Sequence, residues 1–335
     1  MQDSSRRKIR VSIGSAIALN LIRAEMREKP STTYLLTYYP GKCSANCGFC
    51  SQARLSTGRS DLLSRVTWPL FQLDDVIENL EVAVKEGFIR RTCIQALNYP
   101  GMLEDVLSIT AEIRSRVDVP VSLSCQPLGE EHMKALAEAG LDTIGIPIDT
   151  ATEELFEAVK GAAASGPYNW KSHIDALRRA VEVFGKGRVY THLIVGLGET
   201  DEDIVHVIQE MVDMDVFPGL FAFTPLLGTM LEGRPQPQLS RYRRLQLAHY
   251  LVTHWARRFE AMKFEGRDLV SFGVSSDEVR NAVRSGRPFL TSGCPHCNRP
   301  YYNERPSGPI YNYARPLDRD EILAIEREMA LSGLI

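Results

Sequence analysis

From residue 34 onward, strand-like and helix-like segments alternate along the chain, and this alternation limits the possible folds more than any other feature. Apolar runs rich in β-branched and aromatic residues predict strands, and apolar residues at helical spacing predict the helices between them. The expected strands cover residues 34–39, 89–97, 119–124, 143–148, 188–195, 220–225 and 269–274. Such alternation indicates parallel strands joined by right-handed crossovers. Seven or eight such units favour a closed or nearly closed (β/α) barrel over an open six-stranded sheet.

The chain divides into three parts. Residues 1–32 precede the alternation, and their apolar run Val11–Ile22 predicts an amphipathic leader helix packed on the domain. Residues 33–290 form the predicted barrel. Residues 291–335 form a C-terminal arm, which is rich in Pro, Gly, Asn, Tyr and Arg up to residue 316 and ends in a helix. A segment without periodicity needs something other than an ordinary core to hold it.

Composition indicates a folded protein that works in a reducing compartment. Hydrophobic residues make up 44% and charged residues 24%, and a net charge of −3 argues against nucleic-acid binding through a general basic field. No apolar run reaches the roughly 18 residues that span a bilayer, and no A-x-A cleavage site follows the leader. The odd count of seven cysteines disfavours a disulfide framework. We therefore expect a cytoplasmic protein without nucleic-acid or membrane partners.

The first cysteine group consists of Cys43, Cys47 and Cys50, and its spacing is C-x3-C-x2-C. Three thiolates can bind a four-iron cluster and leave the fourth iron open to chelate a cofactor. The group directly follows the first predicted strand, and loops after barrel strands carry the active site of barrel enzymes. A zinc site is the alternative, although the segment offers no fourth ligand nearby.

The other cysteines are Cys93, Cys125, Cys294 and Cys297. Cys93 lies in the second predicted strand and Cys125 ends the third, so the two sulfurs could share a metal centre. Cys294 and Cys297 form a C-x2-C pair in the arm, which is typical of iron–sulfur or zinc sites. Two buried small hydrophobes and a separate zinc or redox clip are the alternatives. The economical interpretation is two clusters, bound by three and four thiolates, because it uses every cysteine.

The first cysteine motif, with Phe49 before its last cysteine, resembles that of the radical S-adenosylmethionine superfamily. In that family the open iron binds S-adenosylmethionine, and one electron from a low-potential donor cleaves it to a 5′-deoxyadenosyl radical. The resemblance implies that Cys43, Cys47 and Cys50 hold this [4Fe-4S] cluster and take part in catalysis.

Two further segments extend the resemblance. Residues 192–199 (HLIVGLGE) resemble the family's fifth-strand segment G-x-I-x-G-x-x-E, with His192 in place of the first glycine, and residues 221–229 resemble its sixth-strand segment. The cofactor-binding residues implied by these matches are Phe49, Val195, Gly196, Glu199, Phe223 and Thr224. Asp149, after the fourth strand, matches an acidic residue that biotin synthase places near nucleoside and substrate, so the resemblance implies a catalytic and cofactor-binding role for it. Capping of the next helix is the alternative role for Asp149.

The sulfur-inserting members of the superfamily refine the interpretation of the other cysteines. Cys93 and Cys125 fall where biotin synthase has two ligands of its sacrificial two-iron cluster. The third cysteine of that cluster would fall at Tyr190 and its arginine ligand near Ser271, so both are missing here. The resemblance then implies an auxiliary [4Fe-4S] cluster, at the C-terminal mouth of the barrel, held by Cys93, Cys125, Cys294 and Cys297.

The likeness over most of the chain is to the two-protein lipoyl synthase, whose components are biotin-synthase-like chains. Residues 33–38 (TYLLTY) and 292–300 (SGCPHCNRP) carry it. It implies sulfur insertion at C8 or C6 of a protein-bound octanoyl chain, with the auxiliary cluster as sulfur donor. The implied partners are an octanoylated lipoyl domain or glycine-cleavage H protein, the sister component and a low-potential electron donor.

Two other functions are weighed against this one. The first is biotin-synthase-like sulfur insertion, or other radical chemistry, on a free small molecule. The second is a non-catalytic iron–sulfur scaffold or electron carrier, which would have no need of the two nucleoside-binding segments. His192, on the fifth strand, could face the site, and Arg299, in the arm, could bind the cofactor carboxylate or an acidic partner, or lie in solvent.

Overall fold

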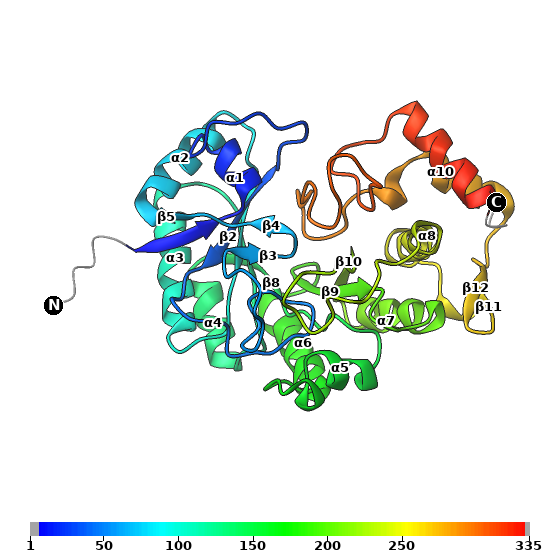
Figure 1. Ribbon diagram of the computed structural model, residues 1–335, viewed down its shortest axis with the longest axis horizontal. Helices are drawn as coiled ribbons and strands as arrows, with labels where there is room; N and C mark the ends of the chain where they lie inside the picture. The colour runs from blue at the N-terminus through cyan, green and yellow to red at the C-terminus, as the bar shows by residue number, and fades with distance from the viewer. Residues whose placement is uncertain (1–6, 332–335) are drawn as a thin grey trace.

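A computed structural model describes residues 7–331, and its centre is an eight-stranded sheet in the order β10-β9-β8-β7-β6-β2-β1-β5 (Figure 1). Parallel pairing joins six of these strands, namely β2 (Thr32–Thr37), β6 (Arg91–Gln95), β7 (Val121–Ser124), β8 (Leu141–Gly145), β9 (Val189–Val195) and β10 (Phe217–Ala222). Strands β1 (Lys8–Val11) and β5 (Leu70–Gln72) add to the β2 side in antiparallel orientation. The predicted mostly parallel α/β architecture is therefore present.

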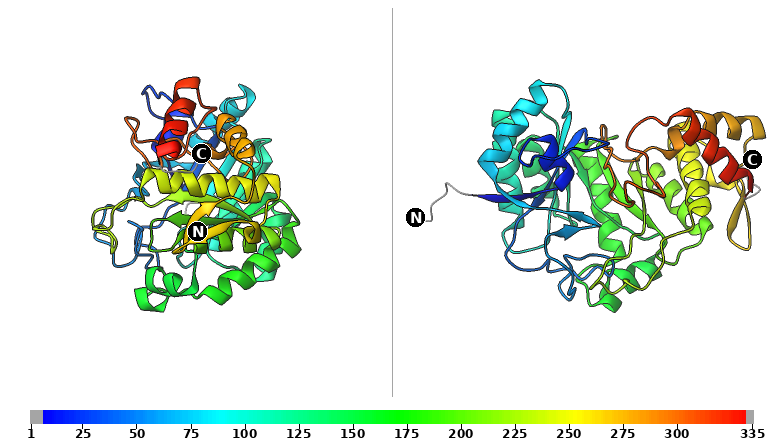
Figure 2. Two further views of the ribbon diagram at one scale, coloured as in Figure 1. Left: turned by 90° about the vertical axis from the view of Figure 1, so that its right-hand side faces the viewer. Right: turned by 45° about the horizontal axis from the view of Figure 1, so that its top comes forward.

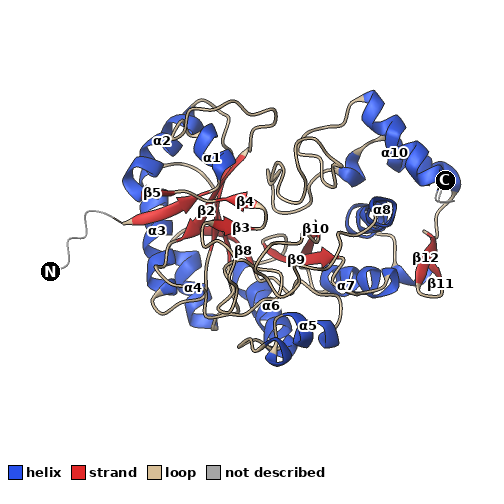
Figure 3. Cartoon of the chain, viewed as in Figure 1, coloured by secondary structure: helices blue, strands red, loops and turns tan. Residues whose placement is uncertain are grey.

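Helices cover the outer side of this sheet, as Figure 3 shows. They are α2 (Leu73–Lys85), α3 (Met102–Arg116), α4 (Glu130–Glu138), α5 (Glu153–Val159), α6 (Trp170–Phe184), α7 (Asp201–Asp213) and α8 (Leu239–Trp255). Apolar spacing sets their orientation, because α6 buries His173, Ala176, Leu177, Ala180 and Phe184 on one stripe. Shorter elements complete the chain, namely α1 (Ile13–Ala18), β3 (Leu62–Leu63), β4 (Val66–Thr67), β11 (Lys263–Glu265), β12 (Asp268–Ser271), α9 (Ser276–Arg284) and α10 (Arg319–Leu331). No helix within residues 7–331 is long and apolar enough to cross a membrane.

The sheet is open, so the predicted closed barrel is not found. Within residues 7–331, no pairing joins β10 to β5, the two edge strands. The seventh predicted strand, 269–274, contributes β12, which pairs only with β11. The loop between them is Gly266-Arg267, and both residues have positive φ, as a tight two-residue hairpin requires. This local turn directs β12 back onto β11 and away from the free edge of β10.

The N-terminal segment begins as strand β1, and of the leader helix predicted over Val11–Ile22 the structure has only α1 (Ile13–Ala18). In β1 the buried Ile9 and Val11 alternate with the exposed Lys8 and the half-buried Arg10, which is the period of a half-buried strand, and β1 pairs with β2 and β5. Helix α1 then covers only Ile13–Ala18, and its N-cap Ser12 accepts the Ser15 N–H. Residues 1–6 of the predicted leader and 332–335 of the arm lie outside the described residues.

The loop part of the arm, residues 291–316, lies on the open side of the sheet between β10 and the start of β2, whereas α10 packs on α8 and α9 (Figure 2). On the β10 side, the Leu220 N–H donates to the Ser292 hydroxyl at 2.8 Å. On the β2 side, the Ser31 and Thr32 hydroxyls donate to the His296 carbonyl at 2.7 and 2.8 Å. Polar side chains thus replace the missing strand pairing with hydrogen bonds to a loop.

Candidate active site

The motif loop, residues 43–50, follows β2 and is fixed by hydrogen bonds to three distant segments. The Ser44 N–H donates to the Asn98 carbonyl at 2.7 Å, and the Gly48 N–H donates to the Val159 carbonyl at 2.7 Å. The Asn46 side chain donates to the Ala164 carbonyl at 2.6 Å. These bonds tie the loop to the segments after β6 and α5 and so preset the positions of its cysteines.

The donor set of the motif loop fits an iron–sulfur cluster. All three cysteines are free thiols, and the Asn98 N–H already donates to the Cys43 sulfur at 3.3 Å. Burial raises the pKa of Cys50 to about 12 and also raises that of Cys47, so both thiols would lose their protons to bind a metal. Within residues 7–331, no three His, Cys, Asp or Glu side chains converge on one metal-ion position. A cluster differs because it distributes its ligands over several irons.

Asp149 lies directly beside the motif loop and does not cap the next helix. It follows β8 with a φ of +65°, and its carboxylate pairs with the buried Lys160 ammonium at 2.7 Å. Its backbone joins β9, because its N–H donates to the His192 carbonyl and its carbonyl accepts the Ile194 N–H, both at 2.8 Å. Helix α5 is capped instead by Thr152. A non-glycine residue in the left-handed region at a strand end is typical of functional sites.

Replacing Lys160 by Met is expected to lower the free energy of unfolding by about 3–5 kcal/mol, because it leaves the buried Asp149 carboxylate without its cation. Urea unfolding under anaerobic conditions measures this. Lys171→Met on the exposed face of α6 is the matched control and should change the free energy by less than about 0.5 kcal/mol. Adding Asp149→Asn to Lys160→Met should recover most of the loss, because asparagine removes the unpaired charge and tolerates the left-handed φ of this position. A single variant as stable as the control would contradict the buried pair.

Three of the predicted cofactor-binding residues, at and after the end of β9, shape the backbone and do not line the cavity, namely Val195, Gly196 and Glu199. The Glu199 carboxylate accepts the N–H groups of Gly196, Leu197 and Gly198 at 2.8–3.0 Å, so it holds the loop and does not face the cavity. Gly196 has a φ of +109°, and an added Cβ would lie 3.0 Å from Pro237 and 3.1 Å from Phe223, so only glycine fits. Val195 is buried and accepts the Phe223 N–H.

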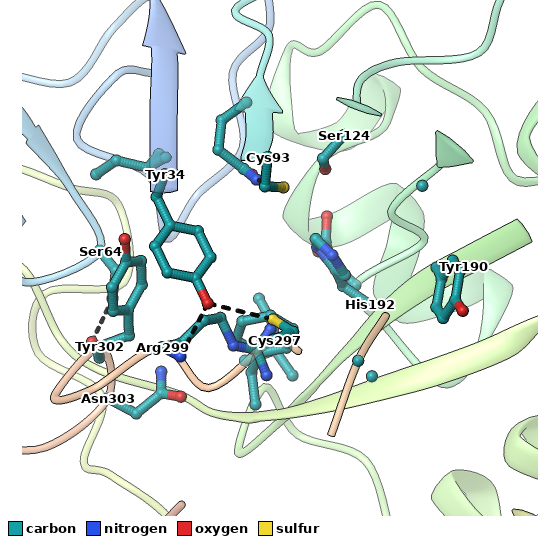
Figure 4. A pocket seen from close by; sticks show the side chains of 18 of the residues that line it. Tyr34, Ser64, Cys93, Ser124, Tyr190, His192, Cys297, Arg299, Tyr302 and Asn303 are labelled. Carbon is teal, nitrogen blue, oxygen red and sulfur yellow. Dashed lines mark hydrogen bonds between the residues drawn. The ribbon is translucent and has the colours of Figure 1, made fainter. Parts of the chain in front are cut away.

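A single cavity of about 210 Å³ has residues of both the motif loop and the arm in its lining. Figure 4 shows Cys93, Cys297 and Arg299 among the residues that line it. On the motif-loop side it is lined by Phe49, Cys50, Asp149, His192, Phe223 and Thr224. On the arm side it is lined by Cys93, Cys294, Cys297 and Arg299. Burial lowers the pKa of His192 to about 4, so this side chain is neutral at pH 7. Most of the predicted site residues therefore share one enclosure.

Three of the four auxiliary cysteines lie together, and we call Cys93, Cys294 and Cys297 the arm group. Tyr34, which faces Cys93 across β2 and β6, has its hydroxyl 3.5 Å from the Cys297 sulfur. The Arg91 guanidinium donates to the Pro295 carbonyl at 2.9 Å. These anchors belong to the amino-terminal halves of β2 and β6, so the arm enters opposite the predicted C-terminal mouth. The arm occupies this end because the open sheet leaves room for it beside β10.

Cys125 does not join the arm group. It follows β7, is buried in the hydrophobic core, and does not line the cavity. In β7, Ser122, Leu123 and Ser124 line the cavity, and because side chains alternate along a strand, the Ser122 and Ser124 side chains share one face. Ser122 is the direct register partner of Cys93, and its hydroxyl donates to the Cys294 sulfur at 3.7 Å. In the sequence, only the alternation of side chains along a strand indicates which residues of β7 face the cavity.

The structure also shows where Tyr190, Ser271 and Arg299 lie relative to the cavity. Tyr190 lines the cavity, whereas Ser271 lies in the β11–β12 hairpin and does not. Arg299 is buried, in contrast to a solvated arm residue, and its guanidinium lies 3.7 Å from the centre of the Phe221 ring. The same guanidinium donates to the Ser292 carbonyl at 2.7 Å. The sequence alone does not identify Tyr34, Arg91 or Ser122 as site residues, because their roles depend on where the arm lies.

The chain resembles known proteins both in its sequence and in its fold. Among curated relatives, the biotin synthase of Schizosaccharomyces pombe is 28% identical over 273 residues, which cover 77% of this chain and 70% of that protein. The biotin synthase of Maricaulis maris is 25% identical over 278 residues, which cover 81% of this chain and 78% of that protein. Both are distant relatives by identity.

Solved structures support the fold. Methylornithine synthase aligns with a TM-score of 0.52 and 16% identity, covering 90% of this chain and 82% of that one. The FeFe-hydrogenase maturase HydG from Carboxydothermus hydrogenoformans aligns with a TM-score of 0.50 and 17% identity, covering 72% of this chain and 55% of that one. The family model described as Radical SAM superfamily matches residues 38–211. Because that match covers more than half of the chain and contains the whole motif loop, the chain belongs to the radical SAM superfamily.

Proposed function

We propose that the protein inserts sulfur at an unactivated carbon by radical S-adenosylmethionine chemistry. The observation that carries this proposal is the single cavity, which has Cys50 of the motif loop on one side and the arm group on the other. An acceptor placed between them would meet the radical source from one side and a sulfur source from the other. The biotin synthase relatives support the same type of reaction.

Membership of the superfamily implies a [4Fe-4S] cluster and S-adenosylmethionine. Cys43, Cys47 and Cys50 would hold this cluster, and their half-buried free thiols and preset loop fit that role. When bound, the cluster and the cofactor would together supply the radical that removes a hydrogen atom from the acceptor. Cys93, Cys294 and Cys297 would hold a second cluster that provides sulfur.

The chain's own contribution is to position the acceptor and to exclude water. Glu199 fixes the backbone of residues 196–198, which leaves Phe223 and Thr224 as the wall for the nucleoside. The Lys160 ammonium holds the Asp149 carboxylate in one orientation beside Cys50. Neutral His192 adds a polar group without a charge. Holding the reacting atoms in line can supply a large share of the barrier reduction, and a dry cavity protects the radical.

Two acceptors are proposed. The relatives favour a free small molecule, as in biotin synthase. The second candidate is a protein-bound octanoyl chain on a lipoyl domain or glycine-cleavage H protein, with a sister synthase component as a further partner. The arm favours this second acceptor, because Cys294 and Cys297 lie in the segment whose sequence resembles the two-protein lipoyl synthase.

The experiment offers both acceptors to the anaerobically reconstituted protein with S-adenosylmethionine and a strong reductant. Mass spectrometry measures 5′-deoxyadenosine and sulfur added to dethiobiotin or to an octanoyl-lysyl peptide. We expect sulfur in one product, in proportion to the 5′-deoxyadenosine released. Release of 5′-deoxyadenosine without sulfur in either product, with the arm cluster shown to be loaded, would refute sulfur insertion. Absence of 5′-deoxyadenosine from a protein with its full iron content would favour an electron carrier.

A further inference from the structure

The arm group has a fourth neighbour that is not a cysteine. Cys93 on β6 and Ser122 on β7 are register partners, so their side chains leave the sheet on the same face, and both line the cavity. The Ser122 hydroxyl lies 3.7 Å from the Cys294 sulfur. Cys125 lies three residues further along the chain, outside the cavity. A site built around the arm group therefore has the Ser122 oxygen beside it, whereas the sequence predicted the Cys125 sulfur in this place.

The surroundings of Ser122 suit a bound oxygen. Its Oγ accepts a hydrogen bond from the Arg91 guanidinium at 2.8 Å and another from the Thr143 hydroxyl at 2.7 Å. Arg91 is buried and is held in turn by the Asp142 carboxylate at 2.7 Å. A tetrahedral oxygen with two accepted bonds and its own Cβ keeps its fourth direction for its O–H, which here donates to the Cys294 sulfur, so loss of this proton frees the direction toward Cys294.

We propose that the auxiliary cluster is bound by Cys93, Cys294, Cys297 and the Ser122 oxygen, and that Cys125 is not a ligand. The proposal rests on the proposed function, in which a second cluster occupies the arm side of the cavity. Ser122 binds as an alkoxide, so its proton leaves to solvent as the iron–oxygen bond forms, as the thiol proton of each cysteine does. The buried Arg91 cation and the Thr143 hydroxyl stabilise the negative oxygen.

The test isolates the arm cluster. In a protein with Cys43, Cys47 and Cys50 replaced by alanine, any remaining iron reports on the auxiliary site alone. After anaerobic reconstitution, iron and sulfide are counted, and Mössbauer and electron paramagnetic resonance spectra identify the cluster type. Cys125→Ala should keep the iron content of this parent, whereas Cys93→Ala, a matched change on the neighbouring strand, should lose most of it.

Ser122 is tested by two substitutions in the same parent. Ser122→Ala should convert the four-iron cluster to a three-iron form, which is paramagnetic when oxidised, and Ser122→Cys should restore four irons with an altered spectrum. Unchanged spectra in Ser122→Ala would overturn the oxygen ligand. Loss of iron in Cys125→Ala equal to that in Cys93→Ala would overturn the whole ligand set.

The two proposals fail in different ways. The ligand set is judged by iron and spectra in a protein that cannot cleave the cofactor. Sulfur insertion is judged by product in the protein with both cysteine groups intact. Four-iron spectra that follow the predicted pattern, together with no sulfur in any product, would refute the function and leave the ligand set standing.

Discussion

A protein in which Cys43, Cys47 and Cys50 are all replaced by alanine is expected to release no 5′-deoxyadenosine above the rate without enzyme. The three thiols are the described sulfurs of the motif loop, and without them neither a cluster nor an open iron exists to bind and reduce S-adenosylmethionine. The loop itself should survive, because its bonds through Ser44, Asn46 and Gly48 do not involve the sulfurs. The measurement is 5′-deoxyadenosine by chromatography under strong reductant.

Cys125→Ala is the control for this triple variant, since it removes a buried thiol away from the cavity. It should keep cofactor cleavage and the full iron count. The triple variant should keep the iron of the auxiliary site, about four atoms of the eight expected for two four-iron clusters. Continued release of 5′-deoxyadenosine by the triple variant would show that the motif loop is not the radical source.

The sequence predicted the parallel strands well because each is a short apolar run with its own helix. The predicted strand 188–195 is β9 (Val189–Val195), and the predicted strand 220–225 is shifted by about three residues from β10 (Phe217–Ala222). Strand boundaries depend on neighbours, whereas the existence of a strand depends mainly on its own residues. The same locality explains why the helices between the strands were found.

Closure of the sheet could not be predicted from the same pattern. Segment 269–274 has a strand-like composition, yet the turn Gly266-Arg267 pairs it with β11. A hydrogen bond from the Leu269 N–H to Asp201 then holds the hairpin against the start of α7. Strand propensity does not reveal which neighbour a strand will choose, because that choice depends on turn geometry and long-range packing.

The candidate site likewise has one part that local sequence predicts and one part that depends on long-range packing. Cysteine spacing identified the motif loop, because its three ligands lie within eight consecutive residues. The auxiliary site joins segments that are about two hundred residues apart, so it depends on the phase of β7 and the path of the arm. A shift in strand phase exchanges the cavity face for the core face. Ser122 and Cys125 are three residues apart and so lie on opposite faces: Ser122 lines the cavity, and Cys125 is buried in the core.

Changing Cys294 and Cys297 together to alanine is expected to stop sulfur transfer while cofactor cleavage continues. The arm cysteines line the far side of the cavity from Cys50, so their loss removes the proposed sulfur source and leaves the motif loop intact. Iron should fall by up to one cluster, from about eight atoms per chain to about four. Cys125→Ala again serves as the control and should lose neither iron nor sulfur transfer.

The arm itself should loosen only in part in this double variant. Its backbone keeps the hydrogen bonds from Arg91 to Pro295 and from Ser31 and Thr32 to His296, none of which involves a sulfur. Limited proteolysis should therefore show faster cleavage within residues 291–316, and adding Arg91→Met should speed it further, because that change removes a buried anchor. Zinc in the purified protein, with the full iron count kept in the double variant, would identify a separate zinc clip. That result would remove the proposed sulfur source, because cysteines that hold zinc cannot hold the second cluster.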